Sequence, residues 1–516
     1  MKTKIILLLI SIIFITAPVF SQSAYVKETE KLADGHFADA NYNLALKKYL
    51  EILKTDDNNL KWNYQIGLCY IFGSYQNKKA IPYLEKTLKT NYNNDVNYYL
   101  PLAYLNDYQF TKATKLLDIF ISTPEVEEGY IKKAKRLKEM CNNAIALMKT
   151  PVNVKFENLT DINSTKDDYN AFINSSEKFI ILSANKKYDP DFETYSTNVY
   201  TSVLGVDEKW TFPAPVKKIN TFDNEEINFM SKNGKYLYIR NSFDDDYSDM
   251  ICGLQKGNSI KLDEENPLNK LVDNGKFQYG MSTNEDNTIV YFGSKVEDNY
   301  DIYMLRKLPN GEWSDIEKLG DIINTKYDEV LPIISADGKT LYFASEGHNS
   351  MGGLDLFVTN YNETAKTWSK PKNLGYPINT TDDDYVISFF NNNSNALIST
   401  IREGGKGGRD IYKITFPEVD PKLSVVKLSI QKGTKEKHEA VNQDLQIEVK
   451  VFDLSNNLHS SFTSNTSTGN AIIAVPAGKY KLKIDTFGDY PLKELDVDIK
   501  GGDEFQFKYD FNIYVK

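Results

Sequence analysis

The chain has 516 residues and a mass of 58.9 kDa, a length that corresponds to about three or four domains. It contains 71 acidic and 61 basic residues, for a net charge of −10, and only five of the basic residues are Arg. A nucleic-acid-binding protein concentrates Lys and Arg on one face, so this composition argues against that class. With 41% hydrophobic and 26% charged residues, the chain is typical of a globular protein rather than a disordered or membrane-spanning one.

Residues 1–21 have the pattern of a secretory signal peptide. Two lysines precede an apolar run from Ile5 to Ile15, and the small residues Val19 and Ser21 occupy the −3 and −1 positions of a cleavage site. The alternative is a transmembrane anchor, which needs about 20 apolar residues, and Pro18 interrupts this run. We therefore expect an exported protein that associates with a membrane only indirectly, through its partners.

Residues 22–150 contain a helical repeat of about 34 residues. Tyr64 and Tyr98 are 34 residues apart, as are Leu68 and Leu102, and apolar residues within each unit recur at i, i+3, i+4 and i+7. The pattern resembles a tetratricopeptide (TPR) array, and a helix near 125–149 is expected to cap it. The positions that match this family are Ala33, Tyr42, Ala45 and Tyr49, then Gly67, Tyr70 and Ala80, then Tyr104, Phe110 and Ala113.

The TPR resemblance implies a concave groove lined by the first helix of each pair. In one interpretation the groove residues contact a bound peptide or helix; in the other they only pack the helix pairs together. For the array as a whole we expect a protein partner. The residues expected to face the groove are Phe37, Tyr64, Leu68, Tyr98 and Leu102.

A second repeat occupies residues 151–416, where an Asp or Asn followed by two apolar residues recurs at spacings of 51, 52, 54 and 55 residues. Strand-like runs precede these marks, and the clearest runs begin at Asn233-Gly234 and Asp337-Gly338, which accept positive φ at a hairpin corner. About fifty residues with four short strands are typical of one blade of a β-propeller. The five marks begin at Asn198, Asp249, Asp301, Asp355 and Asp410.

Each unit of this repeat closes with a second mark, an apolar residue followed by Asn. Five such marks occur, but the first precedes the first unit and the last unit has none. The simplest solution is circular: residues 152–159 supply the outer strand of the last blade and remove the open edge. We predict five blades, with six as the alternative. The marks contain Asn163, Asn220, Asn269, Asn324 and Asn379.

The segments Ser335–Ser345 and Gly352–Phe357 resemble the WD-repeat-like propeller family of exported bacterial proteins that includes TolB. The resemblance implies that residues 151–416 form a propeller of this kind. The unit at 327–380 matches best, and the unit at 166–220 is the most degenerate.

The sequence contains no catalytic constellation. Acidic pairs recur at the same place in successive units, which favours a turn or strand-entry role over the unique acid and base of a glycosidase. They include Asp167-Asp168, Glu225-Glu226, Asp328-Glu329 and Asp382-Asp383-Asp384. A Ser-His triad would have to recruit one of four His residues, and His348 is expected to be a solvated loop residue.

The three cysteines, Cys69, Cys141 and Cys252, are odd in number and far apart, so they predict no disulfide framework. Cys69 and Cys141 lie among apolar neighbours, where buried free thiols are expected. No ligand loop with metal spacing is present. We therefore predict no catalytic residues, no cofactor and no metal.

Residues 420–516 are predicted to form a small all-β module. Strands alternate with turns over about 95 residues, which is typical of a β-sandwich of six or seven strands. The segment Thr468–Leu482, with its Thr-Gly, short strand and Pro-x-Gly-x-Tyr, resembles the carboxypeptidase-regulatory-like fold. That resemblance implies a spacer or binding module without peptidase activity.

The predicted order of signal peptide, TPR array, propeller and sandwich resembles the multidomain periplasmic accessory proteins of the type IX secretion system. Those proteins continue into an OmpA-like domain that grips peptidoglycan, and this chain ends at Lys516 without one, so direct peptidoglycan binding is not expected. The resemblance implies a non-enzymatic periplasmic scaffold whose partners are envelope or secretion-system proteins. The alternative is a secreted or surface protein whose propeller binds a glycan or a peptide.

Overall fold

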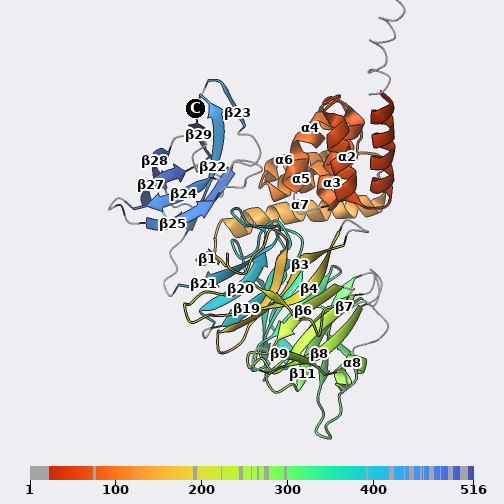
Figure 1. The fold of residues 1–516 in the computed structure, drawn as a ribbon, viewed down its shortest axis with the longest axis vertical. Coiled ribbons are helices and arrows are strands. Elements are labelled where there is room, and N and C mark those ends of the chain that lie inside the picture. Colours follow the sequence, from red (N-terminus) through yellow and green to blue (C-terminus); the bar gives the residue numbers. More distant parts are fainter. Residues whose placement is uncertain are drawn as a thin grey trace, which may run out of the picture. The chain divides into compact units, whose positions relative to one another are not determined.

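The structure is a computed structural model, which describes residues 23–515 outside short gaps. The gaps are residues 74–76, 125, 190–193, 222–223, 243–247, 257–258, 264–265, 272–277, 296–298, 391–392, 418–422, 435, 441–446, 454–455, 457, 464–469, 477, 486–491 and 500–509. The predicted signal peptide lies outside the described residues. The chain divides into two compact units, residues 1–141 and 142–516 (Figure 1). Among the described residues, no helix combines the length and the apolar character that crossing a bilayer requires.

Helices occupy the first unit, and each packs against the next in chain order from α2 to α6. In α2, the buried residues Ala45, Tyr49 and Ile52 follow a spacing of four and three, so they form one face of the helix. Gly67 allows α3 and α4 to approach closely, since a Cβ there would lie 2.4 Å from a methyl group of Leu84. Residues 23–38 are helical, and α2 (Tyr42–Leu53), α3 (Leu60–Gly73), α4 (Ile81–Lys89), α5 (Val96–Asn106), α6 (Phe110–Ser122) and α7 (Glu128–Met148) follow.

Five antiparallel sheets follow between residues 155 and 415 of the described chain. Four of them form from consecutive strands, and several of the connecting hairpins have Gly or Asn at positive φ, as at Gly234, Asn287 and Gly338. The first contains β2 (Asp168–Ile173), β3 (Phe179–Asp189), β4 (Thr194–Val203) and β5 (Ala214–Pro215). The second contains β6 (Asn224–Met230), β7 (Leu237–Ser242), β8 (Ser248–Lys256) and β9 (Ser259–Leu262), followed by the short helix α8 (Pro267–Leu271).

The third and fourth sheets repeat this order. The third contains β10 (Gln278–Thr283), β11 (Ile289–Lys295), β12 (Tyr300–Arg306) and β13 (Glu317–Lys318). The fourth contains β14 (Glu329–Ile334), β15 (Thr340–Ser345), β16 (Asp355–Asn362), β17 (Thr367–Trp368) and β18 (Lys372–Asn373).

The fifth sheet combines strands that are distant in the sequence. Its strands β19 (Ile387–Phe390), β20 (Asn395–Thr400) and β21 (Asp410–Thr415) are joined by β1 (Lys155–Asn158), which pairs antiparallel with β21 so that Lys155 lies opposite Thr415. This is the pairing expected for the segment that follows the helices. Neighbouring sheets also contact one another, and β2 of the first sheet contacts β19 and β20 of the fifth. The arrangement is consistent with a β-propeller.

The closing asparagines join each sheet to the next segment of chain. The side-chain oxygen of Asn324 accepts the N–H of Ile302 at 2.8 Å, and its amide donates to the carbonyl oxygen of the same residue at 3.0 Å. Asn220 forms the same two hydrogen bonds with the backbone of Val199, and Asn379 forms them with the backbone of Leu356. We call these side chains the asparagine clips. They explain why this residue recurs once per unit.

Asn163, in the mark that precedes the first sheet, forms the equivalent clip with the last sheet. Its side-chain oxygen accepts the N–H of Ile411 at 2.8 Å, and its amide donates to the carbonyl oxygen of Ile411 at 2.8 Å. The first and fifth sheets are therefore joined by the same device as two consecutive sheets.

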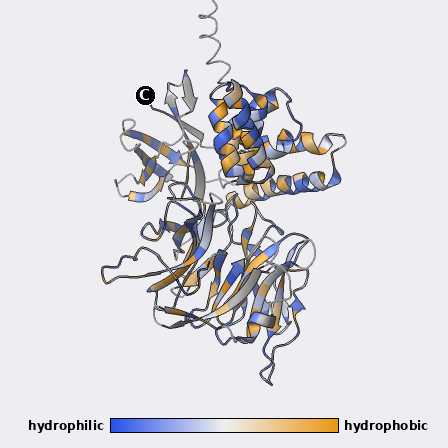
Figure 2. Cartoon of the chain, turned by 45° about the vertical axis from the view of Figure 1, so that its right-hand side comes forward, coloured by the Kyte–Doolittle hydropathy of each residue, from blue (hydrophilic) through white to orange (hydrophobic). Residues whose placement is uncertain are grey.

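Two further four-stranded sheets follow in the last hundred residues. One contains β22 (Leu423–Gly433), β23 (His438–Ala440), β26 (Asn470–Pro476) and β29 (Asp510–Val515); the other contains β24 (Glu448–Phe452), β25 (Leu458–Thr463), β27 (Gly478–Asp485) and β28 (Lys493–Ile499). Their buried faces share one hydrophobic core, to which Leu428 and Ile473 contribute from the first sheet and Val449 and Leu482 from the second. Strands β23 and β29 were not expected from the sequence. Hydrophobic and hydrophilic residues alternate along several of these strands (Figure 2).

Candidate functional site

The five residues predicted to face a groove are placed differently from one another. Tyr64 and Leu68 are buried, with 8% and 7% of their surface exposed. Phe37, Tyr98 and Leu102 are half-buried. The ring of Tyr64 packs against Tyr92 at 5.9 Å, so this side chain packs the helices together, as the second interpretation allows.

A continuous row of aromatic rings crosses the helical unit. From residues 23–38 to α5, Phe37 contacts Tyr42 (centroids 5.3 Å apart), Tyr42 contacts Phe72 (5.4 Å) and Phe72 contacts Tyr99 (5.5 Å). The row then continues through Tyr98 to Tyr130 of α7, over separations of 5.2 and 5.8 Å. We call these six residues the aromatic strip. Residues 23–38 and the helices α2, α3, α5 and α7 each contribute at least one ring to it.

The aromatic strip is partly open to solvent. Phe72 is 44% exposed and Tyr130 is 42% exposed, while their neighbours in the row are half-buried. Burial raises the pKa of Tyr99 to about 12, so its hydroxyl remains a neutral donor at physiological pH. The strip therefore offers a mostly apolar surface with hydroxyl groups along it, which suits contact with another protein.

Sequence reasoning assigned Phe37 and Tyr98 of this strip to the binding surface and named Tyr42 only as a position that matches the TPR family. It missed Phe72, Tyr99 and Tyr130. Phe72 lies four residues after Leu68, so it occupies the same side of α3. Extending the predicted face by one helical turn would have found it. Tyr130 belongs to the expected capping helix, for which no surface residue was predicted.

The recurring acidic residues of the sheets are buried structural acceptors. Glu329 accepts the backbone N–H and the hydroxyl of Thr325 and the hydroxyl of Ser345. Asp384 accepts the N–H and the hydroxyl of Thr380 in the same geometry. Desolvation by burial raises the pKa of both carboxyl groups to about 7. Asp168 accepts the N–H and the hydroxyl of Ser164, and Glu225 accepts those of Thr221. These hydrogen bonds confirm the strand-entry interpretation for the four carboxylates Asp168, Glu225, Glu329 and Asp384.

A cluster of charged and aromatic side chains connects β2, β6, β7 and β10. The guanidinium of Arg240 lies 2.8 Å from a carboxylate oxygen of Glu226 and stacks over the ring of Tyr279, with its carbon 4.6 Å from the centroid. The other oxygen of Glu226 accepts the hydroxyl of Tyr169 at 2.9 Å. The guanidinium of Arg409 stacks over Tyr385 at 4.2 Å and lies 3.6 Å from a carboxylate oxygen of Asp383. Because these charges are matched within the cluster, we assign it to holding the strands together.

His348 is not the solvated residue that the sequence suggested. Its ring packs against Phe343 and Phe357, with centroids 5.9 and 5.1 Å away, and its Nε2 lies 2.9 Å from the carbonyl oxygen of Ile323. The loop between β15 and β16 therefore directs this side chain toward the sheet.

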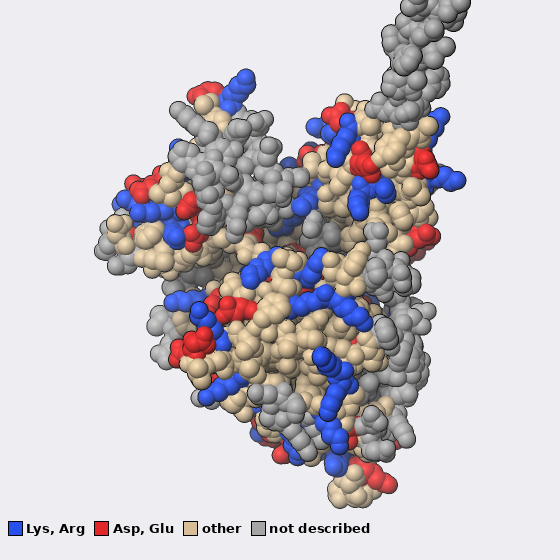
Figure 3. Space-filling view, viewed as in Figure 1, with Lys and Arg blue, Asp and Glu red and all other residues tan. Residues whose placement is uncertain are grey.

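The three cysteines are free and buried. Burial raises the pKa of the Cys69 and Cys141 thiols to about 12, so both remain protonated and unreactive at neutral pH. Within the described residues, no group of three His, Cys, Asp or Glu side chains is arranged to hold a metal ion. On the face drawn in Figure 3, both basic and acidic side chains occur among the described residues.

No protein-family model matches the chain, and no curated protein sequence matches it. Similar solved structures include TolB from Acinetobacter baumannii (13% identity, TM-score 0.30, covering 56% of this chain and 70% of that chain). Another is the β-propeller domain of Cps50 (Swd1) from Myceliophteria thermophila (8% identity, TM-score 0.28, covering 63% of this chain and 99% of that chain). A third is a fructofuranosidase from Schwanniomyces occidentalis (11% identity, TM-score 0.34, covering 68% of this chain and 84% of that chain). Since each TM-score is below 0.5, the propeller-like arrangement rests on strand pairing and sheet contacts. The enzymes among these structures do not decide whether this chain catalyses a reaction.

Proposed function

We propose that the chain is a non-enzymatic scaffold of the periplasm that holds an envelope or secretion-system protein on its aromatic strip. In this proposal the helices form a TPR array, the five sheets form a closed five-bladed propeller and the last two sheets form a carboxypeptidase-regulatory-like sandwich. The predicted signal peptide and the order of these modules support an exported protein associated with the outer membrane or with type IX secretion.

The aromatic strip is the observation that carries this proposal. Large aromatic side chains dominate the binding energy of protein interfaces because each one removes a large apolar area from water. Phe72 is 44% exposed in the middle of the strip, between the half-buried rings of Tyr42 and Tyr99. A bound segment that covers Phe72 would bury apolar surface against rings that already have fixed positions, so ordering these side chains adds little entropic cost.

The proposal of a non-enzymatic protein is supported by the recurring carboxylates. Glu329 and Asp384 accept hydrogen bonds from the backbone and hydroxyl groups of their own turns, in matching places of two sheets. A residue that performs the same structural task in several repeats is poorly suited to act as the single acid or base of a catalytic pair.

Site-specific photocrosslinking in intact cells tests the proposal. A benzoylphenylalanine at position 72 is expected to crosslink an envelope protein, because this ring lies in the middle of the strip. The matched control places it at Ile119 of α6, which is 48% exposed and lies outside the strip. Tyr99→Phe keeps the ring and should keep the partner, whereas Tyr99→Ala should reduce the crosslink at least fivefold.

The same experiment defines the contradicting results. Equal crosslinking from positions 72 and 119 would mean that the strip is not the docking surface. Recovery of no envelope protein from either position, together with fractionation of the protein outside the cell, would favour the secreted glycan- or peptide-binding alternative.

A further inference from the structure

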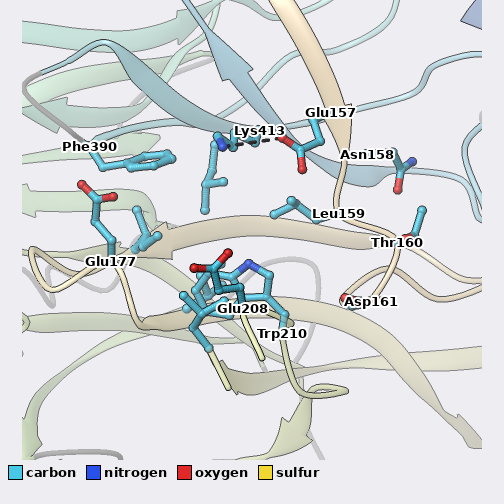
Figure 4. A pocket seen from close by; sticks show the side chains of 14 residues that line it. Glu157, Asn158, Leu159, Thr160, Asp161, Glu177, Glu208, Trp210, Phe390 and Lys413 are labelled. Carbon is cyan, nitrogen blue, oxygen red and sulfur yellow. Dashed lines mark ion pairs between the residues drawn. The ribbon is translucent and has the colours of Figure 1, made fainter. Parts of the chain in front are cut away.

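A pocket of about 320 Å³ opens between the first sheet and the fifth sheet, beside β1 (Figure 4). Its apolar lining includes Trp210 and Phe390, which pack against the buried cluster that contains Ile180 and Leu397. The volume is at the lower end of the roughly 300–1,000 Å³ that small-molecule pockets occupy. The residues that line the pocket come from β-strands and from the turns that connect them, so this inference does not depend on the aromatic strip.

Acidic side chains surround this apolar lining. Four carboxylates face the pocket, whereas Lys413 supplies the ammonium group, and it lies 3.5 Å from Glu157. Figure 4 shows Glu208 beside the indole of Trp210 and Glu177 on the side nearer Phe390. The pocket therefore combines a net negative charge with an aromatic surface. Its acidic residues are Glu157, Asp161, Glu177 and Glu208.

Two of these glutamates occupy backbone positions that disfavour glutamate. Glu177 and Glu208 have φ values of 57° and 60°, in the left-handed region that glycine and asparagine adopt more easily. The other sheets provide the comparison, because they contain the same hairpins. The residues that correspond to Glu177 in the other four sheets are Gly234, Asn287, Gly338 and Asn393. Glu208 corresponds to Gly311 in the third sheet and to Lys366 in the fourth.

The first sheet thus departs from its four sister sheets at the turn of Glu177, and this departure places a carboxylate in the pocket that Glu208 also lines. The turn itself does not require glutamate, since glycine or asparagine closes the same hairpin elsewhere in the chain. At position 177, where all four sister turns use glycine or asparagine, the glutamate indicates that the side chain serves another purpose. The pocket is the feature that Glu177 and Glu208 share.

We propose that this pocket binds an arginine side chain in a basic segment of a partner protein. A guanidinium is planar, so it stacks on the indole of Trp210 while it donates to the carboxylates of Glu177 and Glu208. The aliphatic stem would lie against the apolar lining. The negative charge of the pocket disfavours an anionic ligand, and its carboxylates have no role toward a purely apolar one.

Fluorine NMR of the full chain labelled with 5-fluorotryptophan tests this proposal. The protein has four Trp residues, and a Trp210→Phe variant assigns the resonance of Trp210. The probes are acetylated tetra-arginine amide, tetra-lysine amide and neutral maltotetraose. Tetra-arginine is expected to shift the Trp210 resonance, to bind more tightly than tetra-lysine and to leave the other three resonances in place.

The test variant is the double substitution Glu177→Gly and Glu208→Gly. We expect its affinity for tetra-arginine to fall at least tenfold while its melting temperature stays the same or rises, because glycine suits both turns better. A structural role for the glutamates would instead lower the melting temperature. Lys366→Gly is the backbone control, since Lys366 is exposed at a φ of 54° and lies outside the pocket. Glu312→Gln removes an exposed charge from a hairpin of another sheet, and both controls should leave the affinity unchanged.

Three results would overturn the proposal. The first is an unchanged affinity in the double variant, and the second is tetra-lysine binding as tightly as tetra-arginine. The third is a shift of the Trp210 resonance by maltotetraose and not by tetra-arginine, which would identify a glycan site instead.

Discussion

Replacing Asn324 by alanine tests whether the asparagine clips hold the sheets together. Asn324 is 4% exposed, and its side chain makes three hydrogen bonds: it accepts from the N–H of Ile302 at 2.8 Å and donates to the carbonyl oxygens of Ile302 at 3.0 Å and Leu319 at 2.8 Å. Each hydrogen bond contributes about 1 kcal/mol, and a buried N–H that loses its partner costs about 1–3 kcal/mol more.

The expected destabilisation follows from what the alanine variant leaves behind. The carbonyl oxygen of Ile302 keeps the N–H of Leu319 as a donor at 3.0 Å, so the unsatisfied groups are the N–H of Ile302 and the carbonyl of Leu319. We therefore expect the free energy of unfolding to fall by roughly 3–5 kcal/mol. The exposed Asn310, in a hairpin of the same sheet, provides the control, and Asn310→Ala should cost less than about 1 kcal/mol.

Urea unfolding of the full chain, followed by tryptophan fluorescence, measures this difference. Hydrogen exchange at the Ile302 amide locates it, because this amide should lose its protection. A loss below about 1 kcal/mol for Asn324→Ala would refute the reasoning. Asn163→Ala then tests the junction of the first and fifth sheets, and its cost should match that of Asn324→Ala within about 1 kcal/mol. A much smaller cost would mean that this junction does not close the sheets into a ring.

Three further predictions concern the same sheets. Burial raises the pKa of Glu329 and Asp384 to about 7, so the stability that their neutral forms contribute is complete below the unfolded pKa values of 4.5 and 3.8 and is lost as the pH rises through 7. The melting temperature should therefore be higher at pH 5 than at pH 8, and Glu329→Gln should flatten this dependence. Gly280→Ala should cost more than about 3 kcal/mol, because φ is 91° and the new Cβ would lie 2.4 Å from the Cα of Leu331. Gly311→Ala, with φ of 89° and open space around it, should cost only about 1 kcal/mol in the same unfolding assay. Amide exchange in Lys155–Asn158 should be as slow as in β21, since the two strands pair.

The sheets were predictable because their signals are local and repeated. Asp-Gly and Asn-Gly turns mark hairpins, and one closing asparagine marks each unit. The pairing of β1 with β21 is non-local, yet the sequence indicated it, since the mark at Asn163 had no preceding sheet to close. What the marks do could not be read from the sequence. The hydrogen bonds of Asn163 to Ile411 depend on a backbone position 248 residues away.

The helical surface was only partly predictable. Apolar spacing identifies the face of a helix, but exposure depends on what the neighbouring segments place over that face. Tyr64 is 8% exposed and its ring lies against Tyr92, which follows α4 in the chain. Phe72 is 44% exposed on the same helix as Tyr64. The two residues are eight positions apart and share one side of α3, whereas the fold covers the first and leaves the second open.

Internal repeats allow structure and function to be separated within a single chain. Features that every unit shares, such as the asparagine clips, are required by the fold, because each sheet faces the same problem of joining the next. Features that one unit alone possesses need another explanation. Glu177 meets this criterion: its four sister turns use glycine or asparagine at positive φ, and it faces one pocket together with Glu208. A comparison of the repeats in the sequence shows the substitutions, but only the backbone angles show that glutamate is disfavoured at both positions.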